Sequence, residues 1–132
     1  MALKGACLCG GIRYEVEAEP AVVGHCHCTR CQRKGGGGSI TGVLVPHEAI
    51  DLTSGEDLLR TFSEEGFTPR HFCSACGSQI YGSTADFAVI VAGTLEPGTR
   101  LEPQFHMMVD FKAPWDEIHD DLPQFGEYPP SS

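Results

Sequence analysis

All seven cysteines of this 132-residue chain fall into three tight clusters. The clusters are Cys7-Leu8-Cys9, Cys26-His27-Cys28-Thr29-Arg30-Cys31 and Cys73-Ser74-Ala75-Cys76. A disulfide framework usually spreads its cysteines, because a bridge that closes a long loop restricts the unfolded chain most. Thiolates two or three residues apart instead suit one metal ion, since a tight turn can place both at about 2.3 Å from zinc. The spacing therefore indicates metal ligation.

Seven thiols divide into a set of four and a set of three. A structural zinc site is closed by four protein ligands, whereas a catalytic site uses three and keeps one position open. The two outer pairs each come from a single turn and are grouped as a closed four-thiolate site, formed by Cys7, Cys9, Cys73 and Cys76. The remaining trio, Cys26, Cys28 and Cys31, could hold a second zinc whose fourth position is open to water, a thiol or a carbonyl oxygen.

Other partitions of the cysteines stay open at this point. One is a single structural zinc with the trio as reduced or oxidisable thiols, and another is a set of disulfides. His25 or His27 could also complete a zinc site, but on an extended segment the two histidines share the face opposite Cys26 and Cys28. We therefore expect these histidines to orient the site or to face solvent rather than to bind the metal.

A basic segment, Arg30, Arg33 and Lys34, lies beside the trio in an otherwise acidic chain. The chain has 18 acidic and 9 basic side chains and a formal net charge of −9. This balance disfavours nucleic acid as a partner, because nucleic acid needs a broad basic surface. A local basic segment can still attract a small anionic ligand, although solvated surface charge is the simpler interpretation.

Four glycines, Gly35 to Gly38, follow the basic segment directly. Glycine permits close approach of a ligand to the backbone, but it serves equally well in a flexible connector. The run does not continue into the Gly-Lys-Ser/Thr of a phosphate-binding loop. We take Arg33, Lys34 and Gly35 as the candidate ligand-binding residues.

The elements that must position these clusters are short. Residues 12–17 alternate apolar and polar side chains, which is typical of a strand with one buried face. Further strands, bounded by Gly, Pro, Ser, Asp or charged residues, are expected at residues 39–45, 50–54, 58–62, 79–82, 87–92 and 104–109. Brief helices are expected after Cys28, with Thr29 as the cap, and at residues 46–49, where Pro46 can start a turn. The pattern predicts a mainly antiparallel β domain with zinc-bearing turns.

Length and composition favour one domain over residues 1–132, with an irregular acidic tail from about residue 116. We expect Trp115, just before the tail, to pack in the core or at its edge. The first residues lack the apolar region of a signal peptide, and the longest apolar run, residues 87–93, is too short to cross a bilayer. Clustered thiols suit a reducing compartment, so we expect a cytoplasmic protein without a membrane partner. Exposed strand edges leave a homodimer open.

Four segments carry a more specific signal. They are Gly5-Ala6-Cys7-Leu8-Cys9-Gly10-Gly11-Ile12-Arg13-Tyr14, Cys26-His27-Cys28-Thr29-Arg30-Cys31-Gln32-Arg33, Phe72-Cys73-Ser74-Ala75-Cys76-Gly77 and Pro114-Trp115. In this order and spacing the chain resembles the glutathione-dependent formaldehyde-activating family, also called the CENP-V/GFA domain. The resemblance covers nearly the whole chain, residues 4–125.

The resemblance implies a zinc-stapled β-tent fold and two zinc ions per chain, one structural and one held less firmly. It assigns Cys7, Cys9, Cys73 and Cys76 to the first ion and the trio of Cys26, Cys28 and Cys31 to the second, where catalysis would take place. The implied activity is that of a carbon–sulfur lyase, which forms S-hydroxymethylglutathione from glutathione and formaldehyde. Glutathione is thus the expected small thiol substrate. Family members often carry a bulkier stretch in place of Gly35–Gly38, which predicts a wider pocket here.

Two other classes of function remain open. A non-catalytic zinc module that binds a protein partner would need a broad apolar or basic surface and an extra arm, and the sequence has neither. A redox-sensitive zinc thiolate protein would release zinc from the trio on oxidation and form a disulfide there.

Overall fold

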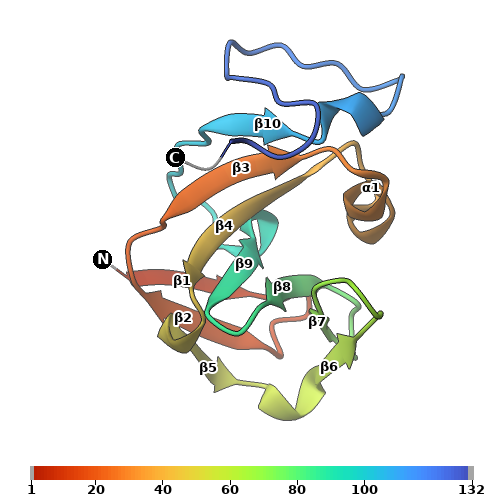
Figure 1. Ribbon diagram of the computed structural model, residues 1–132. Coiled ribbons are helices and arrows are strands. Elements are labelled where there is room, and N and C mark those ends of the chain that lie inside the picture. Colours follow the sequence, from red (N-terminus) through yellow and green to blue (C-terminus); the bar gives the residue numbers. More distant parts are fainter. Residues whose placement is uncertain (1, 131–132) are drawn as a thin grey trace.

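The computed structural model describes residues 2–130, which fold into two β-sheets with one short helix (Figure 1). The small sheet is antiparallel, with strand order β1-β2-β5. Its strands are β1 (Ala2–Ala6), β2 (Arg13–Glu17) and β5 (Ile50–Ser54). β2 is the strand that alternation predicted, and it buries Tyr14 and Val16 while Arg13 and Glu17 stay exposed.

The large sheet has the strand order β10-β3-β4-β9-β8-β7-β6. Its strands are β3 (Val22–Cys26), β4 (Ile40–Pro46), β6 (Leu59–Phe62), β7 (Arg70–Cys73), β8 (Gln79–Ser83), β9 (Phe87–Val91) and β10 (Phe105–Met107). Neighbouring strands run antiparallel except β10, which lies parallel to β3. The sheet curves strongly from β10 and β3 to β6 (Figure 1).

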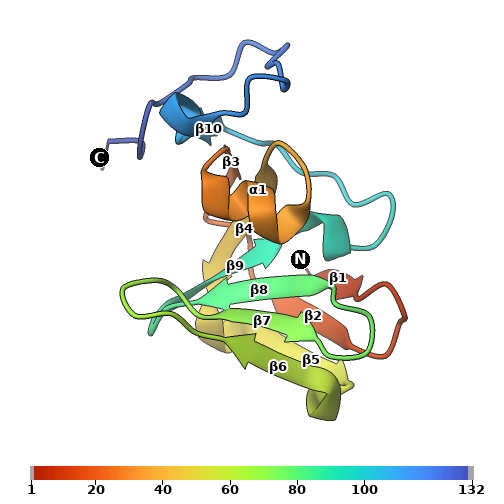
Figure 2. The ribbon, with the colours of Figure 1, turned by 90° about the vertical axis from the view of Figure 1, so that its right-hand side faces the viewer.

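The helical elements are brief. They are α1 (Thr29–Gly35) and the 3₁₀ turns η1 (His47–Ala49), η2 (Glu56–Leu58), η3 (Ala92–Thr94) and η4 (Val109–Phe111). Figures 1 and 2 both place α1 between the β10–β3 end of the large sheet and its β6–β8 end. No helix among the described residues is long and apolar enough to cross a membrane. The mainly β fold with short helices is the one that the sequence predicted.

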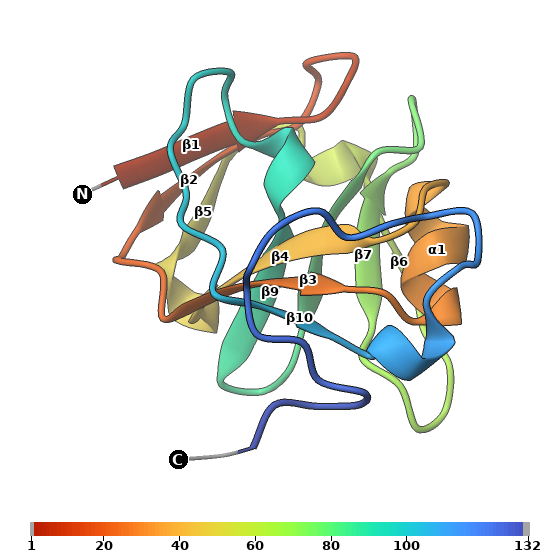
Figure 3. The ribbon, with the colours of Figure 1, turned by 90° about the horizontal axis from the view of Figure 1, so that it is seen from above.

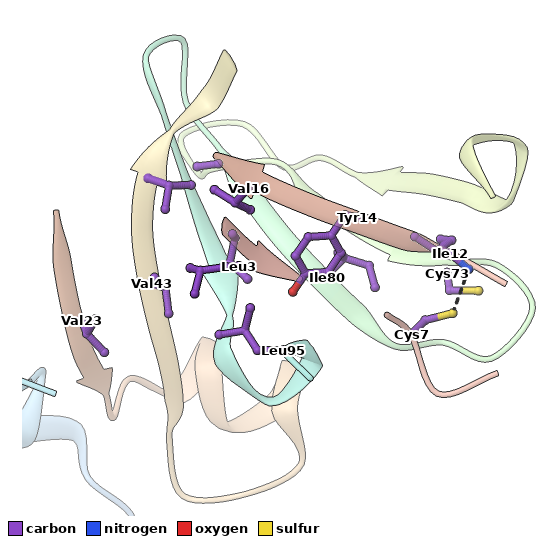
Figure 4. Close-up of a cluster of buried hydrophobic side chains, with 13 residues drawn as sticks. Leu3, Cys7, Ile12, Tyr14, Val16, Val23, Val43, Cys73, Ile80 and Leu95 are labelled. Atoms are coloured by element: carbon purple, nitrogen blue, oxygen red, sulfur yellow. Dashed lines mark hydrogen bonds between the residues drawn. The ribbon is translucent and has the colours of Figure 1, made fainter. Parts of the chain in front are cut away.

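The hydrophobic core lies between the two sheets (Figure 4). The small sheet contributes Leu3, Tyr14 and Val16, and the large sheet contributes Val43 and Ile90, among others. Burial of each such aliphatic side chain contributes about 1.5–3 kcal/mol. The four-cysteine cluster borders this core, since Cys7 and Cys73 are themselves buried in it.

Both faces of β4 and β9 are apolar, although only one faces the core. Val43, Val45, Ala88 and Ile90 point into the core and are fully buried. The alternate residues on the opposite face, among them Leu44, Val89 and Val91, are half-buried and line a cleft. The pairing keeps this face in register across the strands, with Leu44 opposite Val89 and Gly42 opposite Val91.

The fold differs from the sequence predictions in four respects. Strands β1, β3 and β7 were not predicted, because none of them shows a clean alternation of apolar and polar residues. The parallel β10–β3 pair departs from the antiparallel expectation. The cap of α1 is Cys28 rather than Thr29. The prediction that Trp115 packs in or beside the core is wrong, because its side chain is 71% exposed.

The C-terminal segment, residues 112–130, contains no helix or strand beyond an isolated bridge. That bridge joins Gln124 to His106 of β10. The backbone of Phe125 donates to the carbonyl of His106 at 2.9 Å, and the backbone of His106 donates to the carbonyl of Pro123 at the same distance. Figure 3 shows this segment, in deep blue, lying over the β10 and β3 side of the large sheet.

Tyr14 makes folding sensitive to alkaline pH. Its ring is 1% exposed, and its hydroxyl lies 2.6 Å from Thr94 Oγ1. Burial raises the pKa of Tyr14 to about 12, whereas the hydrogen bond to Thr94 lowers it. In the unfolded chain this phenol ionises near pH 10, so the unfolded state releases its proton first as pH rises. The contribution of neutral Tyr14 to the free energy of unfolding is therefore complete below pH 10, and it falls by about 3 kcal/mol between pH 10 and 12. Urea denaturation should show that slope. The Tyr14→Phe variant should lose most of it and keep a smaller part, because burial also raises the pKa of Tyr81.

Candidate metal centres and cleft

The four-cysteine cluster brings two tight turns together. Cys7 and Cys9 lie in the loop between β1 and β2, and Cys73 and Cys76 lie at the end of β7 and in the turn to β8. Each turn closes through a glycine with a left-handed backbone, and those glycines are Gly10 (φ 77°) and Gly77 (φ 80°). Glycine adopts this conformation without a steric penalty. The amide of Gly10 donates to the carbonyl of Cys7, and the amide of Gly77 donates to that of Cys73.

The distances between these thiols fit one tetrahedral ion. All four Sγ atoms lie within 4.8 Å of one another. Cys7 Sγ is 3.5 Å from Cys9 Sγ, and Cys9 Sγ is 3.9 Å from Cys73 Sγ. Four sulfurs about 2.3 Å from a central zinc would be separated by about 3.8 Å. The cluster can therefore hold a metal ion, and its donor set is that of zinc.

Hydrogen bonds to the sulfurs of this cluster favour the thiolate form, which binds a metal cation. The backbone amide of Ile12 donates to Cys7 Sγ at 3.2 Å (dashed in Figure 4), and Ser78 Oγ lies 3.2 Å from Cys76 Sγ. The hydroxyl and amide of Ser78 lower the pKa of Cys76 to about 5. Burial raises the pKa of Cys7, but the hydrogen bonds from Ile12 and the neighbouring thiols outweigh it and leave that pKa below the ordinary value. Thiolates, not thiols, bind metal.

The trio forms where β3 passes into α1. Cys26 ends β3, Cys28 is the N-cap of α1, and Cys31 is buried in the first turn of the helix. Their three ligand atoms also lie within 4.8 Å of one another. The amide of Cys31 donates to Cys28 Sγ at 3.3 Å, so the thiol takes the capping role usually given to Ser, Thr, Asp or Asn.

Protons are shared unequally within the trio. Hydrogen bonds from Cys26 and Cys31, followed by backbone amides of the helix start, lower the pKa of Cys28 to about 2. The same contacts with Cys26 and Cys28 raise the pKa of Cys31 far above its ordinary value. The trio thus favours a single thiolate on Cys28. Full deprotonation requires a cation that neutralises the other two sulfurs.

The neighbouring histidines face away from the trio thiols, as alternation along the strand predicted. Neither His25 nor His27 belongs to a candidate metal group among the described residues. His25 Nδ1 lies 2.7 Å from Thr41 Oγ1, and His27 Nε2 lies 2.8 Å from His106 Nδ1. His106 Nε2 lies 3.0 Å from each carboxylate oxygen of Asp120. This chain of contacts links the segment that bears the trio to the C-terminal tail.

A cleft of about 600 Å³ opens beside the trio. It lies against the face of the large sheet that is turned away from the core, beneath α1. All three trio cysteines line it, and none of the four-cysteine cluster does. Much of the remaining lining is apolar and comes from the sheet and loops; it includes Val22, Leu44, Phe67, Phe87, Val89, Val91, Phe111 and Tyr128.

Two cations that form no ion pair within residues 2–130 line the same cleft. Lys34 and Arg70 take part in no ion pair between described residues. Burial lowers the pKa of Lys34, the thiol of Cys31 raises it, and the nearby charge of Arg70 lowers it further. Arg30 differs, because it pairs with Glu64 and lies 3.6 Å above the ring of Phe67. An anionic ligand group would find complementary charge at Lys34 and Arg70.

The three ligand-binding residues predicted from sequence have different positions. Lys34 lines the cleft and also an adjoining hollow of about 650 Å³, and Arg33 lines only that hollow. Gly35 lines neither; a Cβ there would meet Ile40 at 2.8 Å, so the glycine serves packing. Nor do Gly36 to Gly38 line the cleft.

Sequence reasoning missed Arg70 and the apolar lining. Arg70 is 36 positions from Lys34 and lies in a strand that was not predicted. The lining had a detectable signal, however, because Phe87-Ala88-Val89-Ile90-Val91 is a continuous apolar run. In a mainly antiparallel sheet such a run indicates a strand covered on both faces.

The arrangement defines a class of protein: a mainly β protein with one closed group of four cysteines and one group of three that faces a cleft. Comparison with known proteins supplies the family. The family model described as "Glutathione-dependent formaldehyde-activating enzyme" matches residues 2–110. The chain therefore belongs to this family, as the sequence resemblance indicated.

Individual relatives agree with this assignment. A protein of Halomonas elongata, named "Putative glutathione-dependent formaldehyde-activating enzyme", is 28% identical over 130 residues, which cover 89% of this chain and 82% of that protein. A Fusarium vanettenii protein of the same name is 33% identical over 82 residues, which cover 60% of this chain and 44% of that protein. A crystal structure of a Rhodobacter sphaeroides protein has a TM-score of 0.62 at 22% identity, with 73% of this chain and 90% of that chain covered. This last likeness shows a shared fold.

Proposed function

We propose that this protein is a zinc-dependent carbon–sulfur lyase-type enzyme that forms S-hydroxymethylglutathione from glutathione and formaldehyde. The observation that carries the proposal is the cleft, in which the three trio thiols line one space together with Lys34 and Arg70, two cations that pair with no carboxylate of the described residues. Two zinc ions per chain are proposed, a structural ion at the four-cysteine cluster and a less firmly held ion at the trio. A cytoplasmic location, where glutathione is abundant, accords with this role.

The roles of the residues follow from their positions. Cys26, Cys28 and Cys31 hold the second ion, which when bound supplies the positive charge that keeps a substrate thiol as its thiolate. Lys34 and Arg70 bind carboxylates of glutathione and orient its thiol toward the trio. Arg33, at the adjoining hollow, adds positive charge at longer range.

The reaction needs no redox partner. The thiolate sulfur forms a bond to the formaldehyde carbon, the carbonyl electron pair moves onto oxygen, and that oxygen takes one proton. The substrate thiol releases one proton when it becomes a thiolate, and solvent can carry that proton to the oxygen, so the step is balanced. In the reverse direction the hydroxyl proton leaves and the carbon–sulfur bond breaks. The spontaneous reaction sets the rate that the protein must exceed.

Substitution of Arg70 tests the anion site. Arg70→Gln should weaken glutathione binding by roughly tenfold or more, because a hydrogen bond to a charged group contributes about 1.5–3 kcal/mol. Titration calorimetry on zinc-loaded protein gives the dissociation constant. Arg100→Gln, which changes an exposed arginine outside the cleft, is the matched control. Equal affinities in the two variants would remove Arg70 from the binding site, and a smaller loss is expected for Arg33→Ala.

Catalysis itself is measured by exchange spectroscopy. Selective inversion of the hydroxymethyl signal of S-hydroxymethylglutathione reports the rate of its exchange with free formaldehyde at equilibrium. The zinc-loaded protein should raise that rate above the spontaneous one in proportion to its concentration. An unchanged rate together with intact glutathione binding would leave a binding protein and dismiss the enzyme.

A further inference from the structure

The cleft has an apolar part that glutathione and formaldehyde do not explain. We call Val22, Leu44, Val89 and Val91 the apolar floor, and Phe67, Phe87, Phe111 and Tyr128 the aromatic rim. Formaldehyde is a single polar carbon unit, and glutathione carries two carboxylates, an amine and two amide bonds. Neither offers apolar surface to match a floor of aliphatic side chains.

The floor is continuous with the trio. Cys26, Gly24 and Val22 lie on one face of β3, paired in turn with Ile40, Gly42 and Leu44 of β4. Leu44 then pairs with Val89 of β9, and Gly42 pairs with Val91. On β3 the ring of Phe105 covers Gly24, where a Cβ would meet it at 2.5 Å. Along β4, from Ile40 opposite Cys26 to Leu44, the strand advances by about 13 Å, at about 3.3 Å per residue. A group attached to a sulfur at the trio can therefore extend along the floor over β4 and β9.

An apolar floor on this face is unusual in a sheet of this kind. An antiparallel sheet packs one face on the core and commonly presents polar side chains on the other. Here the core face of β9 is Ala88 and Ile90, and its opposite face is apolar as well. Half-buried aliphatic side chains stay partly hydrated until a ligand covers them, and that burial favours binding.

Exposed aromatic side chains gather at the same place. The described residues include seven large hydrophobic side chains that are exposed, and four of them form the aromatic rim. Their exposed fractions are 51% for Phe67, 43% for Phe87, 49% for Phe111 and 71% for Tyr128. Exposed apolar residues that cluster round a hollow mark a binding site, whereas single ones need no explanation.

The charged side chains and the apolar floor occupy different parts of the cleft, although Arg30 also lies over the ring of Phe67 in the rim. Lys34 and Arg70, together with Thr29, Arg30, Thr68 and Gln79, line both the cleft and the adjoining hollow, so the polar part lies where the two spaces meet. Val22, Leu44, Val89, Phe87 and Tyr128 line the cleft alone. A ligand that matches both parts is anionic at one end and apolar at the other, with its sulfur at the trio.

We infer that the preferred substrate is a glutathione adduct of an aldehyde that bears an alkyl or aryl group, and that this group lies on the apolar floor. The inference rests on the proposed function and extends it from formaldehyde to larger aldehydes. In the cleavage direction the carbon–sulfur bond of the adduct R–CH(OH)–S–glutathione breaks, and its electron pair stays on sulfur. The hydroxyl group loses its proton, and the aldehyde R–CHO is released. The reverse step forms the adduct from the same two molecules.

Stable thioethers provide the test. S-methyl-, S-butyl- and S-hexylglutathione are titrated calorimetrically into zinc-loaded protein, alongside glutathione itself and the thiols butanethiol and hexanethiol. Affinity should rise by about fourfold for each methylene that the floor buries. S-hexylglutathione is therefore expected to bind at least about 50-fold more tightly than S-methylglutathione, which allows for partial burial.

Two variants test whether the gain in affinity with chain length arises at the apolar floor and the aromatic rim. Leu44→Asn should reduce the affinity for S-hexylglutathione by about tenfold, because it removes apolar contact worth more than one buried methylene. The affinity for S-methylglutathione should change by less than about twofold. Phe87→Ser changes an exposed rim residue, so folding is retained even where Leu44→Asn destabilises the sheet. Trp115→Ser is its matched control, because Trp115 is also exposed but does not line the cleft.

The results separate the inference from the proposed function. If glutathione and all three thioethers bind equally, the apolar floor plays no part and the inference falls, while the glutathione site stands. Affinity could instead rise with alkyl chain length equally among the thioethers and the simple thiols, with no tighter binding when glutathione is attached. That result would support the apolar floor but reject glutathione as the part of the substrate that carries the alkyl group. A gain that survives both Leu44→Asn and Phe87→Ser would place the alkyl group elsewhere and overturn the inference.

Discussion

Cys73→Ser is expected to cause the largest loss of stability of any single substitution in this chain. Cys73 is 0% exposed, belongs to the hydrophobic core and supplies one of the four thiols of the closed cluster. The cluster joins the β1–β2 loop of the small sheet to the β7–β8 turn of the large sheet. A structural zinc in small peptides contributes about 10–16 kcal/mol of folding free energy. That range is comparable to the whole stability of an ordinary domain, about 5–15 kcal/mol.

The measurement combines thermal unfolding with zinc analysis by mass spectrometry. The variant should lose one zinc ion per chain and either fail to fold or melt at least about 15 °C lower, because about 1 kcal/mol shifts the melting temperature of a domain of this size by several degrees. Ser78→Ala is an informative companion, since it keeps all four thiols and removes only the hydroxyl beside Cys76. A Cys73→Ser protein that melts near the parent with its zinc content unchanged would contradict a structural metal site.

Cys28→Ser is expected to cause the largest loss of activity while the fold persists. Cys28 carries the favoured thiolate of the trio, with its pKa lowered to about 2 by hydrogen bonds from Cys26 and Cys31. Serine can still cap α1 through its hydroxyl, so the helix start should remain. The trio would keep two thiols and should lose its ion, and with it at least about a hundredfold of the exchange rate, comparable to the loss of one strong electrostatic group in an active site.

Native mass spectrometry and exchange spectroscopy on the same sample check this. The expected result is one zinc per chain, a melting temperature within a few degrees of the parent and an exchange rate near the spontaneous one. The matched control is Ser74→Ala, an exposed change within the other cysteine segment that leaves every thiol in place. Retention of two zinc ions and full exchange activity by Cys28→Ser would show that the trio is not the catalytic metal site.

The two substitutions together separate the two clusters. Loss of stability without Cys73 and loss of activity without Cys28 would assign a structural and a catalytic role. The opposite distribution would place the chemistry at the four-cysteine cluster. Mild peroxide treatment distinguishes the enzyme from a redox-sensitive zinc thiolate protein. The redox-sensitive protein would lose one zinc ion and two free thiols, whereas a lyase would keep its zinc content and its thiol count unchanged.

Much of the site was predictable because it is local. The two turns of the four-cysteine cluster need only a few consecutive residues and a glycine that tolerates a left-handed backbone, Gly10 or Gly77. The trio likewise lies within six residues at the start of α1. Alternation along the strand placed His25 and His27 on the face away from Cys26. Each of these features depends on backbone geometry over a single turn or strand, and that geometry is encoded by neighbouring residues.

The sequence by itself determined the mainly β fold class, the family and the two groups of thiols. The tertiary structure alone brought Arg70 to Lys34, laid β10 parallel to β3 and left Trp115 in solvent. It also decided that the second apolar face of β4 and β9 lines the cleft beside the trio. These outcomes depend on which distant strands pair and in what register, and pairing energy is spread over many weak contacts that no single segment reveals. Turn and strand geometry is local, whereas a cleft is made by residues that only the folded sheet brings together.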